Sequence, residues 1–267
     1  MYAIKENMKK TYEIMMDTHV HTITSVHAYN TIFECVQNAK LNGIESFVVT
    51  DHFGPYFLNG SLFQHYAAIC NMRHINEKIN DIRIITGVEI DIIDKEGNLA
   101  FYDSYFSFDK KKCVCEKLLE KVEVVIASCH EFEHQYNYFE NTEMFINAMK
   151  NPKVNILGHC DRITQTFDIN EVLSMAKKKN KIIELNCSSL EGSDLMAQRL
   201  KELAIKCAEN SVMVSVGTDA HFAYKIGDFT KIKQLLNNIN FPVELIVNTN
   251  YEKFFNCLSK QRKNNSS

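Results

Sequence analysis

Residues 17–21 read Asp-Thr-His-Val-His and end the first of several short β-branched or aromatic runs in the chain. Side chains along a β-strand point alternately to opposite faces, so Asp17, His19 and His21 would share one face. Two imidazoles at positions i and i+2 can therefore bind one metal ion together. Residues 219–221, which read Asp-Ala-His, repeat this alternation near the other end of the chain.

The same unit recurs along the chain: a short apolar run, then polar residues, then an amphipathic stretch. Six further strands are predicted over residues 46–49, 82–88, 122–127, 154–157, 182–185 and 212–216. Helical spacing predicts helices between them, including one over about residues 64–79 and a final long helix around residues 232–239. Alternating strands and helices imply parallel strands with helical crossovers. Seven units without an obvious linker predict a single α/β barrel domain over residues 1–267, frayed after about residue 258.

Nearly every predicted strand is followed by a residue type that binds metal ions. In chain order these residues are His19, His21, His27, Asp51, His52, Glu89, His130, His159, Asn186, Asp219 and His221. The carboxyl ends of barrel strands form one face, so we expect these side chains to converge there. The seven imidazoles, together with the carboxylates of Glu89 and Asp219, exceed what one ion can coordinate. The pattern therefore predicts two or three divalent ions, with Glu89 as a bridging ligand.

The overall composition argues against several classes of protein. The chain has 267 residues, 24% of them charged, and a formal net charge of -3, so bulk electrostatics do not favour nucleic-acid binding. No run of 18 or more apolar residues predicts a membrane span, and the N-terminus lacks a secretory leader pattern. Nine cysteines without a disulfide spacing suit a reducing cytoplasm, where we expect the protein to reside.

Two local patterns suggest other chemistry. Residues 130–134 read His-Glu-Phe-Glu-His and match the zinc-protease pattern H-E-x-x-H, which requires a helix. A β-branched strand precedes this stretch, so we interpret the match as accidental and keep His130 alone as a ligand. Cys129, Cys160 and Cys187 adjoin proposed site residues and could supply a thiolate nucleophile. Neighbours on a strand point to opposite sides, which favours a packing role for them.

The motif set resembles the PHP (polymerase and histidinol phosphatase) superfamily. The resemblance rests on four stretches and two single histidines, and it covers about residues 12–230. They are His19-Val20-His21, Thr50-Asp51-His52, Gly87-Val88-Glu89, His130, His159 and Asp219-Ala220-His221. The resemblance implies a distorted seven-stranded (β/α)7 TIM-like barrel, in agreement with the count of seven units.

Three finer stretches resemble short stand-alone bacterial phosphatases of this family that have a trinuclear metal site. These stretches are residues 25–29, 71–73 and 184–189. The resemblance implies three ligand sets: His19, His21, Glu89 and Asp219 for one ion; Glu89, His130 and His159 for a second; His27, His52 and His221 for a third. Asp17, Asp51 and Asn186 are candidates to orient these ligands.

The implied activity is hydrolysis of phosphomonoesters by a hydroxide that the metal ions activate, with Glu89, Asp219 and His130 among the ligands that hold it. Zinc is the favoured metal, with manganese or iron as alternatives. The expected partner is a small phosphorylated substrate, and relatives of this type can form trimers. Histidinol phosphatase, protein tyrosine phosphatase and exonuclease-like phosphodiesterase activities stay open as alternatives within the family.

Two further functions come from other classes. A metal-dependent C–N hydrolase on a similar barrel typically needs a carbamylated lysine at a strand end, and the chain has no lysine there. A non-catalytic metal-binding or regulatory module would not need the full set of ligands that this chain retains. A hydrolase is therefore the function that the sequence favours.

Overall fold

The computed structural model describes residues 11–75, 77–130 and 136–264, and a parallel β-sheet forms its centre. Seven strands follow one another in the order β1-β2-β5-β6-β7-β8-β9, and every neighbouring pair on this path is parallel. Their bounds are β1 Met16–Val20, β2 Ser46–Val49, β5 Ile82–Asp91, β6 Val124–Ser128, β7 Ile156–Leu157, β8 Ile182–Asn186 and β9 Val214–Gly217. The sheet thus contains the seven parallel strands that the alternation predicted.

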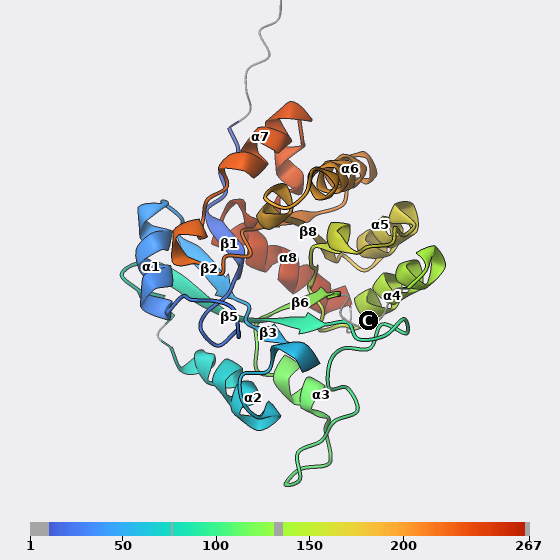
Figure 1. The fold of residues 1–267 in the computed structure, drawn as a ribbon. Coiled ribbons are helices and arrows are strands. Elements are labelled where there is room, and N and C mark those ends of the chain that lie inside the picture. The colour runs from blue at the N-terminus through green and yellow to red at the C-terminus, as the bar shows by residue number, and fades with distance from the viewer. Residues whose placement is uncertain (1–10, 76, 131–135, 265–267) are drawn as a thin grey trace, which may run out of the picture.

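The first and last of these strands meet and nearly close the sheet into a barrel (Figure 1). Val20 and Ala220 form an isolated parallel bridge. The amide of His21 donates to the carbonyl of Ala220 at 3.0 Å, and the amide of Asp219 donates to the carbonyl of His19 at 2.8 Å. These two hydrogen bonds join the two ligand-bearing ends of the chain side by side. The predicted α/β barrel is confirmed.

Helices connect the strands and surround the barrel (Figure 1). They are α1 Ile32–Leu41, α2 Leu62–Asn71, α3 Val114–Leu119, α4 Tyr138–Lys150, α5 Ile169–Lys178, α6 Asp194–Asn210, α7 Thr230–Asn238 and α8 Tyr251–Asn264. Several begin at local signals; Thr31, for example, forms a capping box with Glu34. None of the helices over the described residues combines the length and the apolar character that a membrane crossing needs.

Apolar side chains fill the barrel interior at the amino-terminal ends of the strands, and helix α8 packs against them. Met16, Val48 and Ile85 belong to a buried cluster with other strand residues. Phe254 and Leu258 of α8 join the same cluster and are 0% and 1% exposed. Helix α8 therefore closes the amino-terminal end of the barrel, and polar side chains are left to occupy the carboxyl end.

The predicted helix over residues 64–79 is wrong in its second half. Helix α2 ends at Asn71, and β4 (Lys78–Ile79) then pairs antiparallel with the start of β5. Asn80 and Asp81 connect the two strands, and both have positive φ values, 50° and 70°. A two-residue hairpin loop requires this left-handed backbone, which Asn and Asp tolerate better than most residues. Asn80 and Asp81 therefore favour a hairpin here, although the spacing of apolar residues predicted a helix.

The expected fraying after about residue 258 is also wrong over the described residues. Helix α8 continues to Asn264, so the helix around residues 232–239 is not the last one. Gln261 is fully buried, and its side-chain amide donates to the carbonyl of Asn155 at 3.1 Å. The side-chain amide of Asn155 (Nδ2) donates in return to Oε1 of Gln261 at 2.9 Å. This reciprocal pair holds a segment whose composition suggested only a polar tail.

Candidate metal centre

The carboxyl end of the barrel carries the predicted ligands on different strands and on the loops that follow them. His19 lies on β1, Glu89 on β5 and His52 on the two-residue strand β3 (His52–Phe53), which pairs with β5. His19, His21 and Glu89 are 0% exposed, whereas His27 is exposed at the mouth. His130, His159 and the 219–221 segment follow β6, β7 and β9. The strand ends therefore supply a deep polar cluster, and His27 forms its outer edge.

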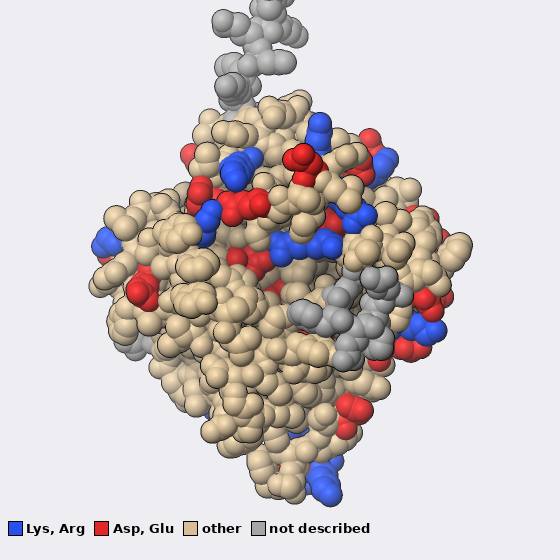
Figure 2. Space-filling view, viewed as in Figure 1, with Lys and Arg blue, Asp and Glu red and all other residues tan. Residues whose placement is uncertain are grey.

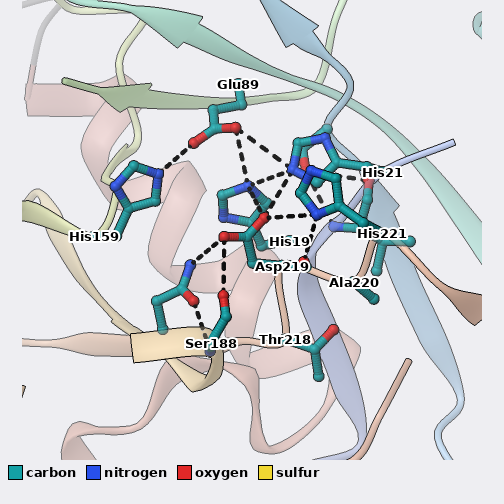
Figure 3. Close-up of polar contacts among 12 residues, drawn as sticks. His19, His21, Glu89, His159, Ser188, Thr218, Asp219, Ala220 and His221 are labelled. Carbon is teal, nitrogen blue, oxygen red and sulfur yellow. Dashed lines mark hydrogen bonds and ion pairs between the residues drawn. The ribbon is translucent and has the colours of Figure 1, made fainter. Parts of the chain in front are cut away.

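Four ligand atoms form the centre of this cluster (Figure 3). The Nε2 atoms of His19 and His21 lie 3.0 Å apart. Oδ1 of Asp219 is 3.0 Å from the His21 Nε2 and 3.6 Å from the His19 Nε2. Oε2 of Glu89 lies 3.5 Å and 3.3 Å from the same two nitrogens. Two nitrogens and two carboxylate oxygens thus face a common point, as the ligands of one ion do.

Glu89 directs its two carboxylate oxygens to different groups of histidines. Oε1 is 2.7 Å from Nε2 of His159 and 3.7 Å from Nε2 of His130. Oε2 is 2.8 Å from Nδ1 of His52 and 3.3 Å from Nε2 of His19. A carboxylate with donors on both oxygens can bridge two cations. This geometry suits the bridging role predicted for Glu89.

The spatial grouping of the remaining histidines differs in part from the expected ligand sets. Ligand atoms within 4.8 Å of one another group His52 with Glu89 and His130, and also with His21 and His221. The resemblance placed His52 only with His27 and His221. The rings of His27 and His221 stack with centroids 4.4 Å apart, and the His27 centroid lies 5.0 Å from that of His52. His52 therefore lies between the two outer sets rather than in one of them.

Several buried atoms of the cluster have no hydrogen-bond partner among the residues that the structure describes, which tests whether metal ions fit. They are both ring nitrogens of His52, Oε2 of Glu89, Nδ1 of His159 and Nε2 of His221. His52 Nδ1 and Glu89 Oε2 lie close together, but without the angles of a hydrogen bond. Unpaired buried polar atoms cost free energy, whereas a bound cation satisfies imidazole nitrogens and carboxylate oxygens alike. The donor set therefore fits divalent ions.

Charge and burial set the protonation of the cluster. Burial, together with the nearby His52 ring, holds the pKa of His21 well below its ordinary value. Burial and His221 lower the pKa of His27 to about 4. These two rings are therefore neutral near pH 7, the form that binds metals. Burial alone would lower the pKa of His19, but Glu184, Glu89 and Asp219 raise it well above its ordinary value. The carboxylates around His19 thus favour positive charge there, which a divalent ion would also supply.

Glu184 was not predicted as a site residue, although it contacts two of the predicted ligands. It lies on β8 and is 0% exposed. Its Oε1 accepts from Nδ1 of His19 at 2.7 Å, and its Oε2 accepts from the backbone amide of His159 at 2.9 Å. Asn186, which was predicted as an orienting residue, donates to the same Oε2 at 3.1 Å. The i and i+2 spacing of Glu184 and Asn186 on one strand was the signal that could have found it.

Two further polar residues at the site had not been predicted. Asp91 lies two residues after Glu89 on β5, and its Oδ1 accepts from Nδ1 of His130 at 2.8 Å. Arg162 follows β7, and its Nη1 donates to Oδ2 of Asp219 at 2.9 Å. Its Nε donates to Oγ of Ser189 at 3.0 Å. Asp91 shares the strand alternation with Glu89, but no spacing in the sequence indicates Arg162.

Asp17 and Asp51 support the site from behind the ligands. Asp51 accepts from Oγ of Ser25 at 2.7 Å, and that oxygen lies 3.2 Å from Nδ1 of His21. Asp17 accepts from the amide of Thr218 at 2.9 Å. The next residue, Asp219, has a φ of 56°, in the left-handed region that non-glycine residues rarely adopt. Asp17 therefore helps to hold the strained backbone that carries the Asp219 carboxylate.

Burial disfavours a thiolate at two of the three cysteines that adjoin the site. All nine cysteines are free. Burial raises the pKa of Cys160 and of Cys187 well above the ordinary value, so neither thiol supplies a thiolate nucleophile near pH 7. His134, the second histidine of the H-E-x-x-H match, lies outside the described residues.

Comparison with known proteins relates this chain to phosphatases. The PHP domain family matches residues 17–240. A protein of Caldanaerobacter subterraneus subsp. tengcongensis, named a probable phosphatase, is 37% identical over 253 residues, which are 94% of this chain and 93% of that protein. A Photobacterium profundum protein named a probable phosphatase is 32% identical over 253 residues, 94% of this chain and 96% of its own length.

A solved structure has the same fold at lower sequence identity. It is the histidinol phosphate phosphatase of Lactococcus lactis subsp. lactis, complexed with zinc, L-histidinol and phosphate. The TM-score is 0.58 and the identity 18%, with 85% of this chain and 94% of that chain covered. At this identity the likeness shows the barrel fold that the two proteins share.

Proposed function

The chain belongs to the PHP domain family, and we propose that it is a phosphatase that hydrolyses phosphomonoesters with two or three divalent metal ions. The nine proposed ligands are His19, His21, His27, His52, Glu89, His130, His159, Asp219 and His221. Zinc is the metal that we favour, and manganese or iron would suit the same imidazole and carboxylate donors.

One observation carries this proposal. The Nε2 atoms of His19 and His21 face the carboxylates of Glu89 and Asp219 at distances between 3.0 and 3.6 Å, and all four side chains are buried at the barrel end. Buried carboxylates are unfavourable unless positive charge compensates them. Ions bound there would lower the pKa of a water molecule and polarise the phosphoryl oxygens. The names of the related proteins support the same reaction.

The chain's own residues would orient the ligands and the substrate. Glu184 holds His19 through Nδ1, so that Nε2 points to the centre of the cluster. Asp91 does the same for His130. Arg162 donates to Asp219, and its side chain is 20% exposed, so it reaches both a ligand and the solvent side of the site. We assign Arg162 to contact a phosphoryl oxygen through Nη1, because its Nε and Nη2 already donate to Ser189, Asn186 and Ser188.

The substrate class and the compartment belong to the same proposal. A net charge of -3 disfavours a long nucleic-acid substrate, which supports a small phosphorylated molecule. Nine free cysteines support a reducing compartment, and we place the enzyme in the cytoplasm. Glu89, Asp219 and His130 would be the ligands nearest to the reacting water molecule.

The test is a phosphatase assay on purified protein loaded with zinc or manganese, over a broad panel of phosphomonoesters. His21→Ala should reduce hydrolysis to near background and lower the metal content measured by elemental analysis. His74→Ala is the matched control, because His74 is exposed and its ring contacts Arg73 rather than the cluster. The proposal is overturned if protein with full metal occupancy hydrolyses no member of the panel.

A further inference from the structure

A collar of aromatic side chains lies beside the metal centre at the mouth of the barrel. We define the aromatic collar as Tyr29, Tyr56, Phe57, Phe222 and Tyr224. These residues come from the loop after β1, from the 3-10 turn after β3 and from the segment after β9. The first and third of these segments also carry the outer histidines His27 and His221, and the turn follows His52 of β3 closely. Short stretches of chain therefore connect the collar to the site.

Phe57 forms the inner wall of the collar. Its ring stacks on His52 with centroids 4.1 Å apart and an interplanar angle of 11°. It lies 5.6 Å from the ring of His27 and meets His130 edge-on at 4.9 Å. Phe57 is 6% exposed. The apolar wall therefore begins inside the site, in contact with predicted metal ligands.

The outer part of the collar is a row of three stacked rings. Tyr29 and Phe222 stack at 5.1 Å with an interplanar angle of 13°, and Phe222 and Tyr224 follow at 5.8 Å. The amide of Tyr29 donates to the carbonyl of His221 at 2.9 Å, which fixes the row to the metal centre. Tyr29, Phe222 and Tyr224 are 67%, 45% and 65% exposed. Large aromatic surface is thus held rigidly in contact with solvent beside the site.

The sequence around Tyr29, Tyr56 and Phe57 lacks charge, whereas Lys225 follows Tyr224 and its Nζ lies 5.8 Å from the centroid of that ring. Residues 22–33 and 53–72 contain no Asp, Glu, Lys or Arg, although 24% of the whole chain is charged. Figure 2 shows the consequence: the surface below the central hollow, over β3 and α2, is almost free of charged side chains, whereas acidic and basic residues appear in and above the hollow. The part of the collar next to β3 is therefore uncharged, and at its outer end Lys225 pairs with Glu191 at 2.6 Å.

We propose that the aromatic collar binds the organic group of the substrate and that this group is an uncharged aromatic ring. The inference rests on the proposed phosphomonoesterase function. Phosphate placed among the ions and near Arg162 would leave the ester's organic group to extend along Phe57 toward the row of rings. Aromatic rings stack favourably at centroid distances of about 4.5–7 Å. A charged group beside Phe57 would lose water and gain no charged partner from residues 53–72.

The inner wall distinguishes this occupant from a second copy of the chain. A flat partner surface would cover the exposed row but would not reach Phe57, which is nearly buried against His52 and His27. A small ring attached to a phosphate would contact both parts. The row also adjoins the reacting centre, because the Tyr29 amide donates to the carbonyl of His221 and Phe222 follows His221 in the chain.

The test compares benzyl phosphate with 2-hydroxyethyl phosphate on the metal-loaded enzyme. Both are esters of primary alcohols, so the phosphorus–oxygen bond that breaks is chemically alike, and only the organic group differs. We expect kcat/KM to favour benzyl phosphate by about tenfold or more, as burial of one ring predicts. In Tyr29→Ala and Phe222→Ala this ratio should fall toward one, mainly through a higher KM for benzyl phosphate.

Phe108→Ala is the matched control, and it should leave the ratio unchanged. Phe108 is also an exposed phenylalanine, 70% exposed, but it packs with Phe63 and Phe106. Equal kcat/KM values for the two esters in the wild type, or an unchanged ratio in both collar variants, would overturn the inference while hydrolysis itself stands. A changed sedimentation coefficient with an unchanged ratio would assign the collar to contacts between copies and also overturn it. Hydrolysis of neither ester by enzyme that hydrolyses other members of the panel would also overturn the inference, whereas failure on the whole panel would overturn the phosphatase function.

Discussion

Nδ1 of His19 donates to Oε1 of Glu184 at 2.7 Å, across the barrel between β1 and β8. Both side chains are 0% exposed. The second oxygen of Glu184 accepts from the amide of His159, so one carboxylate fixes ligands on two other parts of the barrel. A carboxylate bound to the far nitrogen of a metal-binding histidine sets its tautomer and raises its basicity. Glu184 is therefore expected to control metal affinity without being a ligand.

Glu184→Gln should lower metal affinity roughly 10- to 100-fold. The glutamine would present an NH2 group to one of the two N–H donors, His19 Nδ1 or the His159 amide, and that donor would lose its acceptor. The measurement is competition with a chromophoric chelator. Glu209→Gln is the control, because Glu209 is exposed and pairs only with Lys206 at the surface. Unchanged affinity in Glu184→Gln would contradict the role assigned to Glu184.

Gly217→Ala should disturb the same pair from β9. A Cβ atom at position 217 would lie 2.5 Å from Oε1 of Glu184 and 2.6 Å from Cβ of His19, and neither group has room to move in the buried site. Overpacking of this kind typically costs about 1–3 kcal/mol. Urea unfolding of the metal-free protein and chelator competition should both show a loss. Wild-type values in the two experiments would show that the site adapts.

Phe254→Ala should destabilise the barrel by about 3–5 kcal/mol in the free energy of unfolding, the usual cost of deleting a buried phenylalanine ring. Phe254 is 0% exposed and packs on the strand residues that fill the amino-terminal end of the barrel. Asn256→Ala, an exposed change on the same helix, should cost little. The measurement is urea unfolding. Equal stability of the two variants would mean that α8 does not close the barrel energetically.

Lys181 should make stability depend on pH above neutrality. Burial lowers the pKa of its ammonium to about 8, and its Nζ donates to the carbonyl of Asn151 at 3.0 Å. Between pH 8 and the ordinary value of 10.5, the unfolded chain holds a proton that the folded chain has lost. The stability that Lys181 contributes therefore rises with pH over this window and is lowest below pH 8.

The check is the difference in unfolding free energy between wild type and Lys181→Met at several pH values. The other titratable groups contribute equally to the unfolding free energy of both proteins, so their contributions cancel in this difference. The difference should shift in favour of the wild type as the pH rises from about 8 to 10. Lys178→Met, which removes an exposed lysine from the end of α5, should give a flat difference. A flat difference for Lys181→Met would refute the depressed pKa.

The barrel was predictable from the sequence because its evidence is local. Apolar runs such as residues 46–49 alternate with amphipathic stretches, and each pattern identifies an element by its own period. The position of His19, Glu89 and Asp219 at strand ends follows from the same reading, because the carboxyl ends of parallel strands share one face. The local pattern gave a wrong prediction at residues 64–79. It predicted one helix, whereas the second half of this segment leads into a hairpin whose two turn residues have positive φ.

The sequence by itself therefore determined the strand and helix units and the strand ends at which the proposed metal ligands lie. Only the tertiary structure decided which of these residues face one another. The contact of Glu184 with His19, the position of His52 between two groups of ligands and the closure by α8 each join segments far apart in the chain. Such contacts depend on the stagger and closure of the barrel, and no local period encodes these properties.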